Sequence, residues 1–154
     1  MNRLELIRKK MDAIVEAMPD ASARSSAYAH LYGVSMACVL LAQQRGVNSE
    51  LAAVAGMLHD IATYKTGDST AHAHRGAAMA EELLWETELF SEEEIAAVRD
   101  AIFSHSDKLN HHAPFAEVLI DADVLQHCLY DPAEPVAVHE KARFARLRTE
   151  LNLK

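Results

Sequence analysis

The sequence contains little glycine, proline, cysteine or aromatic residue: among 154 residues there are 5 Gly, 4 Pro and 2 Cys, and 6% are aromatic. Such low cysteine usage excludes a disulfide framework, and Cys38 and Cys128 do not share a metal-binding spacing. We therefore expect two reduced thiols in a cytoplasmic protein. The longest unbroken apolar stretch, residues 36–42, is too short to span a membrane, so no membrane partner is expected.

Positive charge is also scarce: the chain has 15 Lys and Arg but 23 Asp and Glu, and its formal net charge is −8. This balance argues against a nucleic-acid polymer as partner, since that binding needs a basic surface. A small anionic ligand remains compatible, because metal ions and a few Lys or Arg side chains can make one pocket locally positive. The N-terminal segment mixes charged with apolar residues, unlike a secretory signal. The sequence leaves open whether the chain forms a homo-oligomer.

The chain does have Ala-rich and Leu-rich segments with apolar residues at helical spacing, and no stretch alternates convincingly for a strand. Its length suits one domain with a real core. The sequence therefore predicts an all-α fold, a single compact bundle of about six to seven helices over residues 1–154. The expected helices cover residues 2–18, 22–44, 50–60, 71–86, 92–104, 114–129 and 136–151, with a loop at 63–70.

Capping residues support several of these boundaries. Ser49 is expected to cap the third helix. Ser91 and Glu94 have the spacing of a capping box at the start of the fifth helix. Pro114 suits the first turn of the sixth helix, because proline there lacks only an N–H that has no helical partner.

An adjacent imidazole and carboxylate, His59-Asp60, follow the small, apolar segment 51–58. A helix this apolar belongs in a core, and a core rarely holds these two groups without a partner for them. A divalent metal ion is the simplest partner, because imidazole nitrogen and carboxylate oxygen are both good ligands. Adjacent residues diverge by about 100° around a helix. The pair therefore converges on one site only near the helix end, or if Asp60 bridges two ions.

Other histidine and aspartate residues supply further ligand candidates. His30 lies in the middle of the second expected helix, on a face of small residues that lets two helices approach closely. His72 opens the fourth expected helix and His105 closes the fifth, at junctions where functional groups are common. Asp123 starts from an apolar helix face and needs a partner there. Asp121 is its competitor and is expected to be more solvated.

The order of these residues and their flanking segments resembles the HD-domain superfamily of metal-dependent phosphohydrolases. The resemblance covers roughly residues 24–128 and is specific as a set, although each segment is short. Four segments carry it: Gly56-Met-Leu-His-Asp-Ile61 resembles GxLHDI, His72-Ala-His-Arg-Gly-Ala77 resembles HxxxGA, Ala101-Ile-Phe-Ser-His-Ser106 resembles AIxxHS, and Asp121-Ala-Asp-Val-Leu125 resembles DADxL.

The resemblance implies an all-helical HD-type domain with shared metal ligands at His30, His59, Asp60 and Asp123. Members with two metal ions add histidines at the positions of His72 and His105, and Asp60 then bridges the ions. His74 could replace His72, because the local pattern allows either residue. One or two divalent ions are therefore expected as the cofactor.

Imidazole and carboxylate ligands without thiolate suit Mn, Fe, Co, Ni, Zn or Mg, and the sequence does not choose among them. Water bound to such an ion is a source of hydroxide near neutral pH. It is expected to attack the phosphorus atom of a small phosphoester, a nucleotide or related metabolite, with Asp60 central to the catalytic site. The chain is thus expected to be a metal-dependent phosphohydrolase acting on a small phosphorylated substrate.

Loop residues are the candidates for contact with this substrate. Lys65, Arg75 or Lys108 is expected to neutralise charge on the phosphate oxygens. His111 or His112 is expected to protonate the leaving alkoxide.

Two other functions remain open. Some members of the superfamily use the same six ligands with iron as oxygenases that oxidise C–H or C–P bonds. A non-catalytic module that binds metal and nucleotide is the third alternative, although no ligand position is missing from this chain.

Overall fold

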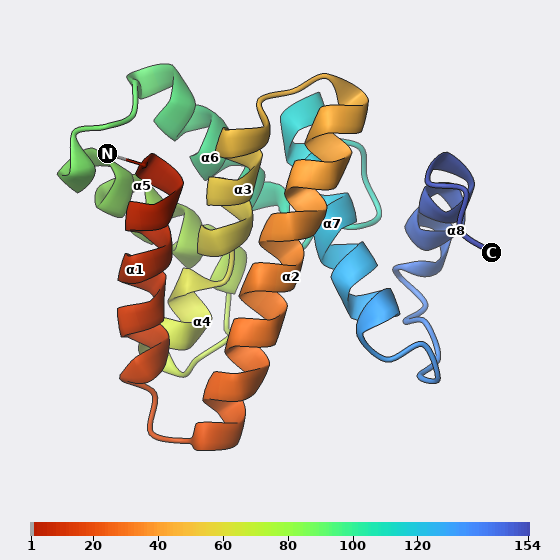
Figure 1. Ribbon diagram of the computed structural model, residues 1–154, viewed down its shortest axis with the longest axis horizontal. Coiled ribbons are helices and arrows are strands. Elements are labelled where there is room, and N and C mark those ends of the chain that lie inside the picture. Colours follow the sequence, from red (N-terminus) through yellow and green to blue (C-terminus); the bar gives the residue numbers. More distant parts are fainter. Residues whose placement is uncertain (1) are drawn as a thin grey trace.

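The computed structural model describes residues 2–154, and every regular element in that range is an α-helix (Figure 1). The all-α prediction is therefore confirmed. The eight helices are α1 (Arg3–Glu16), α2 (Ala21–Arg45), α3 (Ser49–Leu58), α4 (Ile61–Thr66), α5 (His72–Thr87), α6 (Glu92–Ser104), α7 (Pro114–Tyr130) and α8 (Lys141–Glu150).

The helices surround α3, in which every residue from 51 to 58 is buried. Helix α2 packs along α3 and α7, while α5 and α6 form a second closely packed pair. In Figure 1, α3 and α4 lie between α1 and α2, and α8 lies at the outer edge beyond α7. Isoleucine, leucine, valine, methionine and alanine side chains fill the space between the helices. The end of α3 is thereby placed deep inside the bundle.

Most predicted helix ends lie within two residues of the observed ones, and three differences are notable. The loop expected at 63–70 starts later, because a short helix that the sequence did not predict, α4, continues to Thr66 and ends at Gly67, whose φ is 70°. The side chain of Asn48, not Ser49, caps α3 by accepting a hydrogen bond from the backbone N–H of Leu51. The last helix begins at Lys141 instead of residue 136, because the preceding segment forms turns. The capping box at Ser91 and the N-terminal proline of α7 are present as predicted.

Gly56 sets the close approach of α3 to α2. A Cβ atom added there would lie 2.8 Å from the Cα atom of Ser35 and 3.1 Å from Sγ of Cys38. The first of these neighbours is backbone and cannot move away as a flexible side chain would. Small residues on both helices therefore allow the contact that brings His30 towards His59.

We predict that Gly56→Ala destabilises the protein by about 1–3 kcal/mol, the usual cost of overpacking a core. Alanine favours a helix over glycine by roughly 1 kcal/mol, but α2 and α3 must separate to admit the methyl group. Urea denaturation followed by circular dichroism measures the change. Ser25→Ala is the control, because Ser25 is also helical but exposed. A Gly56→Ala variant as stable as that control would contradict the prediction.

Helix α2 is also long and apolar enough to meet a length-and-composition criterion for a membrane span, with a mean hydropathy of 1.3 over 18 residues, of which 39% are buried. Buried helices of soluble proteins meet the same criterion, so one such helix is weak evidence. The packing of α2 against both α3 and α7 is that of a core helix.

Candidate metal centre

Six side chains from five places in the bundle converge on one cluster. Helix α2 contributes one histidine, the end of α3 a histidine and an aspartate, the start of α5 and the end of α6 one histidine each, and α7 an aspartate. The residues are His30, His59, Asp60, His72, His105 and Asp123. They span nearly a hundred residues of sequence, and only the fold brings them together.

His30 and His59 face each other with 3.0 Å between their Nε2 atoms. On the other side of each ring, Nδ1 of His59 lies 2.8 Å from the carbonyl oxygen of Gly56, and Nδ1 of His30 lies 2.7 Å from Oε1 of Gln126. A carbonyl oxygen only accepts hydrogen bonds, so both Nδ1 atoms carry the proton. In the neutral rings, both facing Nε2 atoms therefore present lone pairs.

His72 and His105 repeat this arrangement, with 3.2 Å between their Nε2 atoms. Nδ1 of His105 donates to the carbonyl oxygen of Ile102 at 2.6 Å, and Nδ1 of His72 to that of Ser69 at 3.1 Å. The backbone thus fixes the orientation of both rings. Their Nε2 lone pairs point at each other, as in the first pair.

Asp60 lies between the two histidine pairs and gives one oxygen to each. Its Oδ2 atom is 3.5 Å from Nε2 of His30 and 3.4 Å from Nε2 of His59. Its Oδ1 atom is 3.6 Å from Nε2 of both His72 and His105. The carboxylate therefore bridges two sets of nitrogen ligands, the arrangement that the sequence left open as one explanation of the adjacent pair.

Asp123 completes the first set. Its Oδ1 atom lies 3.4 Å from Nε2 of His30 and is buried without a hydrogen-bond partner. Its Oδ2 atom accepts a hydrogen bond from Nζ of Lys108 at 2.8 Å. An unpartnered buried carboxylate oxygen beside unprotonated imidazole nitrogens is costly unless a cation lies among them.

Two alternatives left by the sequence are resolved by the side-chain directions. The ring of His74 stacks on Phe103 with 4.0 Å between the ring centroids, away from the cluster. Asp121 was expected to be more solvated, and this is wrong: it is buried and bonded to Arg45 at 2.8 Å and to Arg143 at 3.0 Å. These arginines hold Asp121 on the opposite side of α7 from the cluster.

Burial and charge together determine the protonation of the cluster. Burial lowers the pKa of His59 to about 4, despite the opposing charges of Asp60 and Asp123, so this ring is neutral at pH 7. Burial acts to raise the pKa of both carboxyls, but interactions with the surrounding histidines, and for Asp123 also with Lys108, outweigh it and leave both pKa values lowered. Neutral imidazole and ionised carboxylate are the forms that bind metal ions.

Of the two lysines predicted to contact substrate, one is exposed and the other is buried. Lys65 is exposed and lines a groove that ends at His30. Lys108 is buried and donates to two carboxylates, Asp123 and Glu140, so it is not the free loop cation that was expected.

The other polar loop candidates do not reach the cluster. The side chain of His111 is 80% exposed, and its Nδ1 atom lies 3.7 Å from Oε2 of Glu117. His111 therefore does not lie at the cluster, which corrects the prediction that it protonates the leaving group there. His112 contacts Asp107 at 3.1 Å. Arg75 is bonded to Asp68 at 2.9 Å and braces the loop before α5. The loop at 105–113 turns these histidines outward because Asp107 and Glu117 hold them there.

Three residues near the cluster were missed by the sequence analysis. Gln126 orients His30, as described above. His127 lies 3.4 Å from Oδ1 of Asp123 and follows it by four residues on α7, a spacing that could have revealed it. Glu140 is buried and contacts His127 and Lys108, and no local pattern in the sequence marks it.

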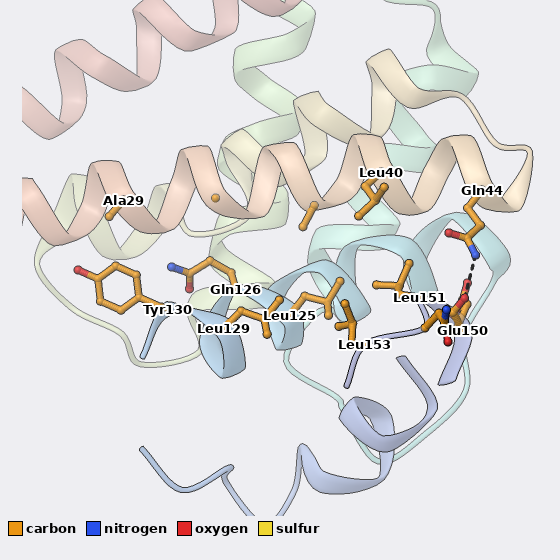
Figure 2. A pocket seen from close by; sticks show the side chains of 13 residues that line it. Ala29, Leu40, Gln44, Leu125, Gln126, Leu129, Tyr130, Glu150, Leu151 and Leu153 are labelled. Atoms are coloured by element: carbon orange, nitrogen blue, oxygen red, sulfur yellow. Dashed lines mark hydrogen bonds between the residues drawn. The ribbon is translucent and has the colours of Figure 1, made fainter. Parts of the chain in front are cut away.

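Two grooves lie beside α2, the first along its N-terminal half and the second along residues 29–44. One, of about 1050 Å³, runs between α1, α2 and the segment 63–67, is mostly apolar, and reaches His30. The other, of about 590 Å³, lies between α2, α7 and the C-terminal residues, and Figure 2 shows Gln126 between the two helices at its edge. Only the first groove includes a residue of the cluster, so it is the better candidate for a substrate path.

The donor set fits a divalent cation. Three overlapping groups bring their ligand atoms within 4.8 Å of one another, and two of them share Asp60. Four imidazole nitrogens and the carboxylate oxygens form the mixed nitrogen and oxygen set that suits borderline divalent ions. A cation between the facing lone pairs would remove the repulsion that the protein alone leaves there.

The comparisons with known proteins agree with this geometry. The family model described as the HD domain matches residues 27–128, a range that contains all six residues of the cluster. No curated protein and no solved structure matches the chain. The matched range covers most of the chain and contains the four motif segments identified in the sequence. The chain therefore belongs to the HD-domain superfamily of metal-dependent phosphohydrolases.

Proposed function

We propose that this protein is a hydrolase that cleaves a small phosphoester with the help of two divalent metal ions. One observation carries the proposal: the two oxygens of Asp60 are divided between two pairs of histidines whose Nε2 lone pairs face each other. Family membership supports metal-dependent phosphohydrolysis in general. Nucleotides and related metabolites are the substrate class to test first.

Each ion would have its own ligands, with Asp60 shared. The first would be held by His30, His59, Asp123 and Oδ2 of Asp60, and the second by His72, His105 and Oδ1 of Asp60. Divalent ions so bound would lower the pKa of water to near neutrality and polarise a phosphoryl oxygen. The ligand types accommodate Mn, Fe, Co, Ni, Zn or Mg.

The protein's own groups fix this geometry before substrate arrives. Backbone carbonyls and Gln126 hold the four rings through Nδ1, so the Nε2 atoms need no reorientation. Lys108 offsets the charge of Asp123. At the groove that ends at His30, the ammonium group of Lys65 would bind phosphate oxygens and orient the substrate.

The size and lining of the groove suit a small substrate better than a polymer. It has about 1050 Å³ of space, close to the upper limit for small-molecule sites, and is lined mainly by apolar residues of α1 and α2. The net charge of −8 is unfavourable for a nucleic acid. We propose a single small phosphorylated molecule as the ligand.

We predict that the purified protein holds two equivalents of metal per chain and that His72→Ala holds about one. The second site loses one of its three ligands, while the first keeps its own. Elemental analysis of protein dialysed against trace metal measures both values. His74→Ala is the matched control, because this neighbouring histidine stacks on Phe103 instead of facing the cluster.

Other stoichiometries would decide against parts of the proposal. One equivalent in both wild type and His72→Ala would reduce the centre to a single ion. No bound metal after reconstitution would overturn the metal centre itself. Chelation with EDTA is expected to abolish phosphoester hydrolysis, and re-addition of Mn, Co, Ni, Zn or Mg to restore it.

A di-iron oxygenase is the second candidate, favoured by the presence of both His72 and His105. Iron as the resident metal, with substrate turnover that stops when oxygen is removed, would support it. Hydrolysis under nitrogen would support the phosphohydrolase instead. A non-catalytic binding module is the third candidate, and metal-dependent turnover of any phosphoester would exclude it.

A further inference from the structure

His127 occupies a position at the metal centre that the six residues above do not explain. Its Nε2 atom lies 3.4 Å from Oδ1 of Asp123, and its ring stacks on His30 with 5.2 Å between centroids and 13° between planes. Its Nδ1 atom lies 2.8 Å from Oε1 of Glu140. The ring is thus held between a buried carboxylate on one side and the cluster on the other.

The contacts of Nδ1 determine which nitrogen carries the proton. The carboxylate of Glu140 is a hydrogen-bond acceptor at 2.8 Å, whereas the ammonium group of Lys108 is 3.4 Å away. Lys108 also makes shorter contacts with Asp123, at 2.8 Å, and with Glu140, at 2.6 Å. Nδ1 therefore donates to Glu140, because the opposite tautomer would set an unprotonated nitrogen against the carboxylate. Nε2 is left with its lone pair towards Asp123.

That lone pair faces the one buried carboxylate oxygen of the cluster that lacks a partner, Oδ1 of Asp123. A lone pair against a carboxylate oxygen is repulsive unless a cation lies near both. Donor atoms of His30, Asp123 and His127 lie within 4.8 Å of one another, as the ligands of one ion do. A histidine nitrogen binds one ion only, so His30 makes this the same ion that His59 would bind.

We infer that His127 is a fifth protein ligand of the first metal ion and that Glu140 orients it. The inference rests on the metal centre of the proposed function, though not on hydrolysis. A carboxylate that accepts the second N–H of a ligand histidine is a common support for metal ligands, and it raises the basicity of the ring. Buried Glu140, brought from the segment before α8, would have this role.

The inference gives the two ions different roles. The first would have five protein ligands and the second only three, namely Oδ1 of Asp60, His72 and His105. Open coordination positions for water and a phosphoryl oxygen would then lie mainly on the second ion. The first ion would be the tightly held one, and its main contribution would be charge.

Metal binding, measured without any substrate, tests this inference. Protein freed of metal by chelation is titrated with Co²⁺, whose visible absorption spectrum changes with coordination number, and with Zn²⁺ by calorimetry. Wild type is compared with His127→Ala, Glu140→Gln and His111→Ala. The last variant removes an exposed histidine that does not reach the cluster.

We expect Glu140→Gln to weaken binding of the tighter ion about 10–100-fold, the usual effect of losing an orienting partner. His127→Ala should weaken it at least tenfold and change the Co²⁺ spectrum, with His111→Ala unchanged in both respects. Unaltered thermal unfolding of the metal-free variants shows that they remain folded. If wild type binds metal and His127→Ala binds it equally, with the same spectrum, His127 is only a charge partner of Asp123 and Glu140. If wild type binds no metal, the proposed function itself fails.

Discussion

Replacement of Asp60 by asparagine is expected to lower phosphoester hydrolysis by at least roughly 10³-fold, or about 4 kcal/mol of activation free energy. Asp60 is the only described residue that contacts both histidine pairs. An amide is a much weaker ligand than a carboxylate and carries no charge, so both ions lose affinity together. Loss of a single ligand from either set would affect one ion directly.

The fold should survive this substitution. Asparagine has the same shape, and its NH₂ group can donate to the Nε2 lone pairs that the carboxylate faced. The measurement is the initial rate on a phosphoester panel at saturating metal, together with metal content by elemental analysis. Asp100→Asn is the matched control, because Asp100 is exposed and pairs with Arg99 on the surface. Retention of both metal equivalents and of activity in Asp60→Asn would exclude Asp60 as the bridging ligand.

The sequence was sufficient for the fold class because each helix has its own local signals. The apolar spacing, the capping box at Ser91 and the proline at the start of α7 are all short-range features. The error at the last helix arose where a tertiary contact decides the boundary. The last helix starts late because Glu140 is drawn in towards Lys108 and His127, and nothing within a few residues of it predicts that contact.

The six residues of the cluster could also be named from the sequence, because five of them lie in short motifs and His30 lies on a helix face of small residues. Their role as metal ligands stays a prediction. The structure adds that the two oxygens of Asp60 lie against different pairs of histidine Nε2 atoms, which explains why both pairs share this carboxylate. It also corrects Lys108, which was expected to meet substrate. Its true partner Glu140 is 32 residues away in the chain, and no pairwise pattern joins them.

The wrong expectation for Asp121 shows the limit of reasoning from one helix face. Its neighbours along α7 suggest solvent, but Arg45 and Arg143 cover it from other elements. Buried charges are satisfied by whichever oppositely charged side chain the fold brings near, and that choice is made at long range. His127 had a local signal, its four-residue spacing from Asp123, which was not used.

Replacement of Arg143 by methionine is expected to lower the free energy of unfolding by roughly 3–5 kcal/mol, the usual cost of breaking a buried ion pair. Nη1 of Arg143 donates to Glu117 at 2.7 Å and to Asp121 at 3.0 Å. Nε donates to the carbonyl oxygen of Lys108 at 2.7 Å, and Nη2 to that of Asn110. Methionine fills the space but removes a donor from each of these acceptors, so that Asp121 keeps only Arg45 and Glu117 only the backbone N–H of His112.

Urea denaturation of the metal-free protein measures the loss. Arg148→Met, an exposed position on the same helix, should change the stability by less than about 0.5 kcal/mol. A double variant, Arg143→Met with Glu117→Gln, should recover part of the loss, because one uncompensated charge is removed. Equal stability of Arg143→Met and Arg148→Met would show that the buried pair contributes no net stability.

Arg143→Met should also weaken metal binding, because Arg143 holds the loop that carries Lys108. Its guanidinium fixes the backbone of Lys108, whose ammonium group donates to Asp123 and Glu140. If the loop at 105–113 becomes mobile, Asp123 loses its fixed contact with Lys108. Arg143→Lys should behave similarly, since one ammonium group cannot reproduce a forked contact with two carboxylates and two carbonyls. Metal affinity measured below the unfolding transition separates this local effect from global unfolding, and unchanged affinity would show that the arginine stabilises the fold without positioning the site.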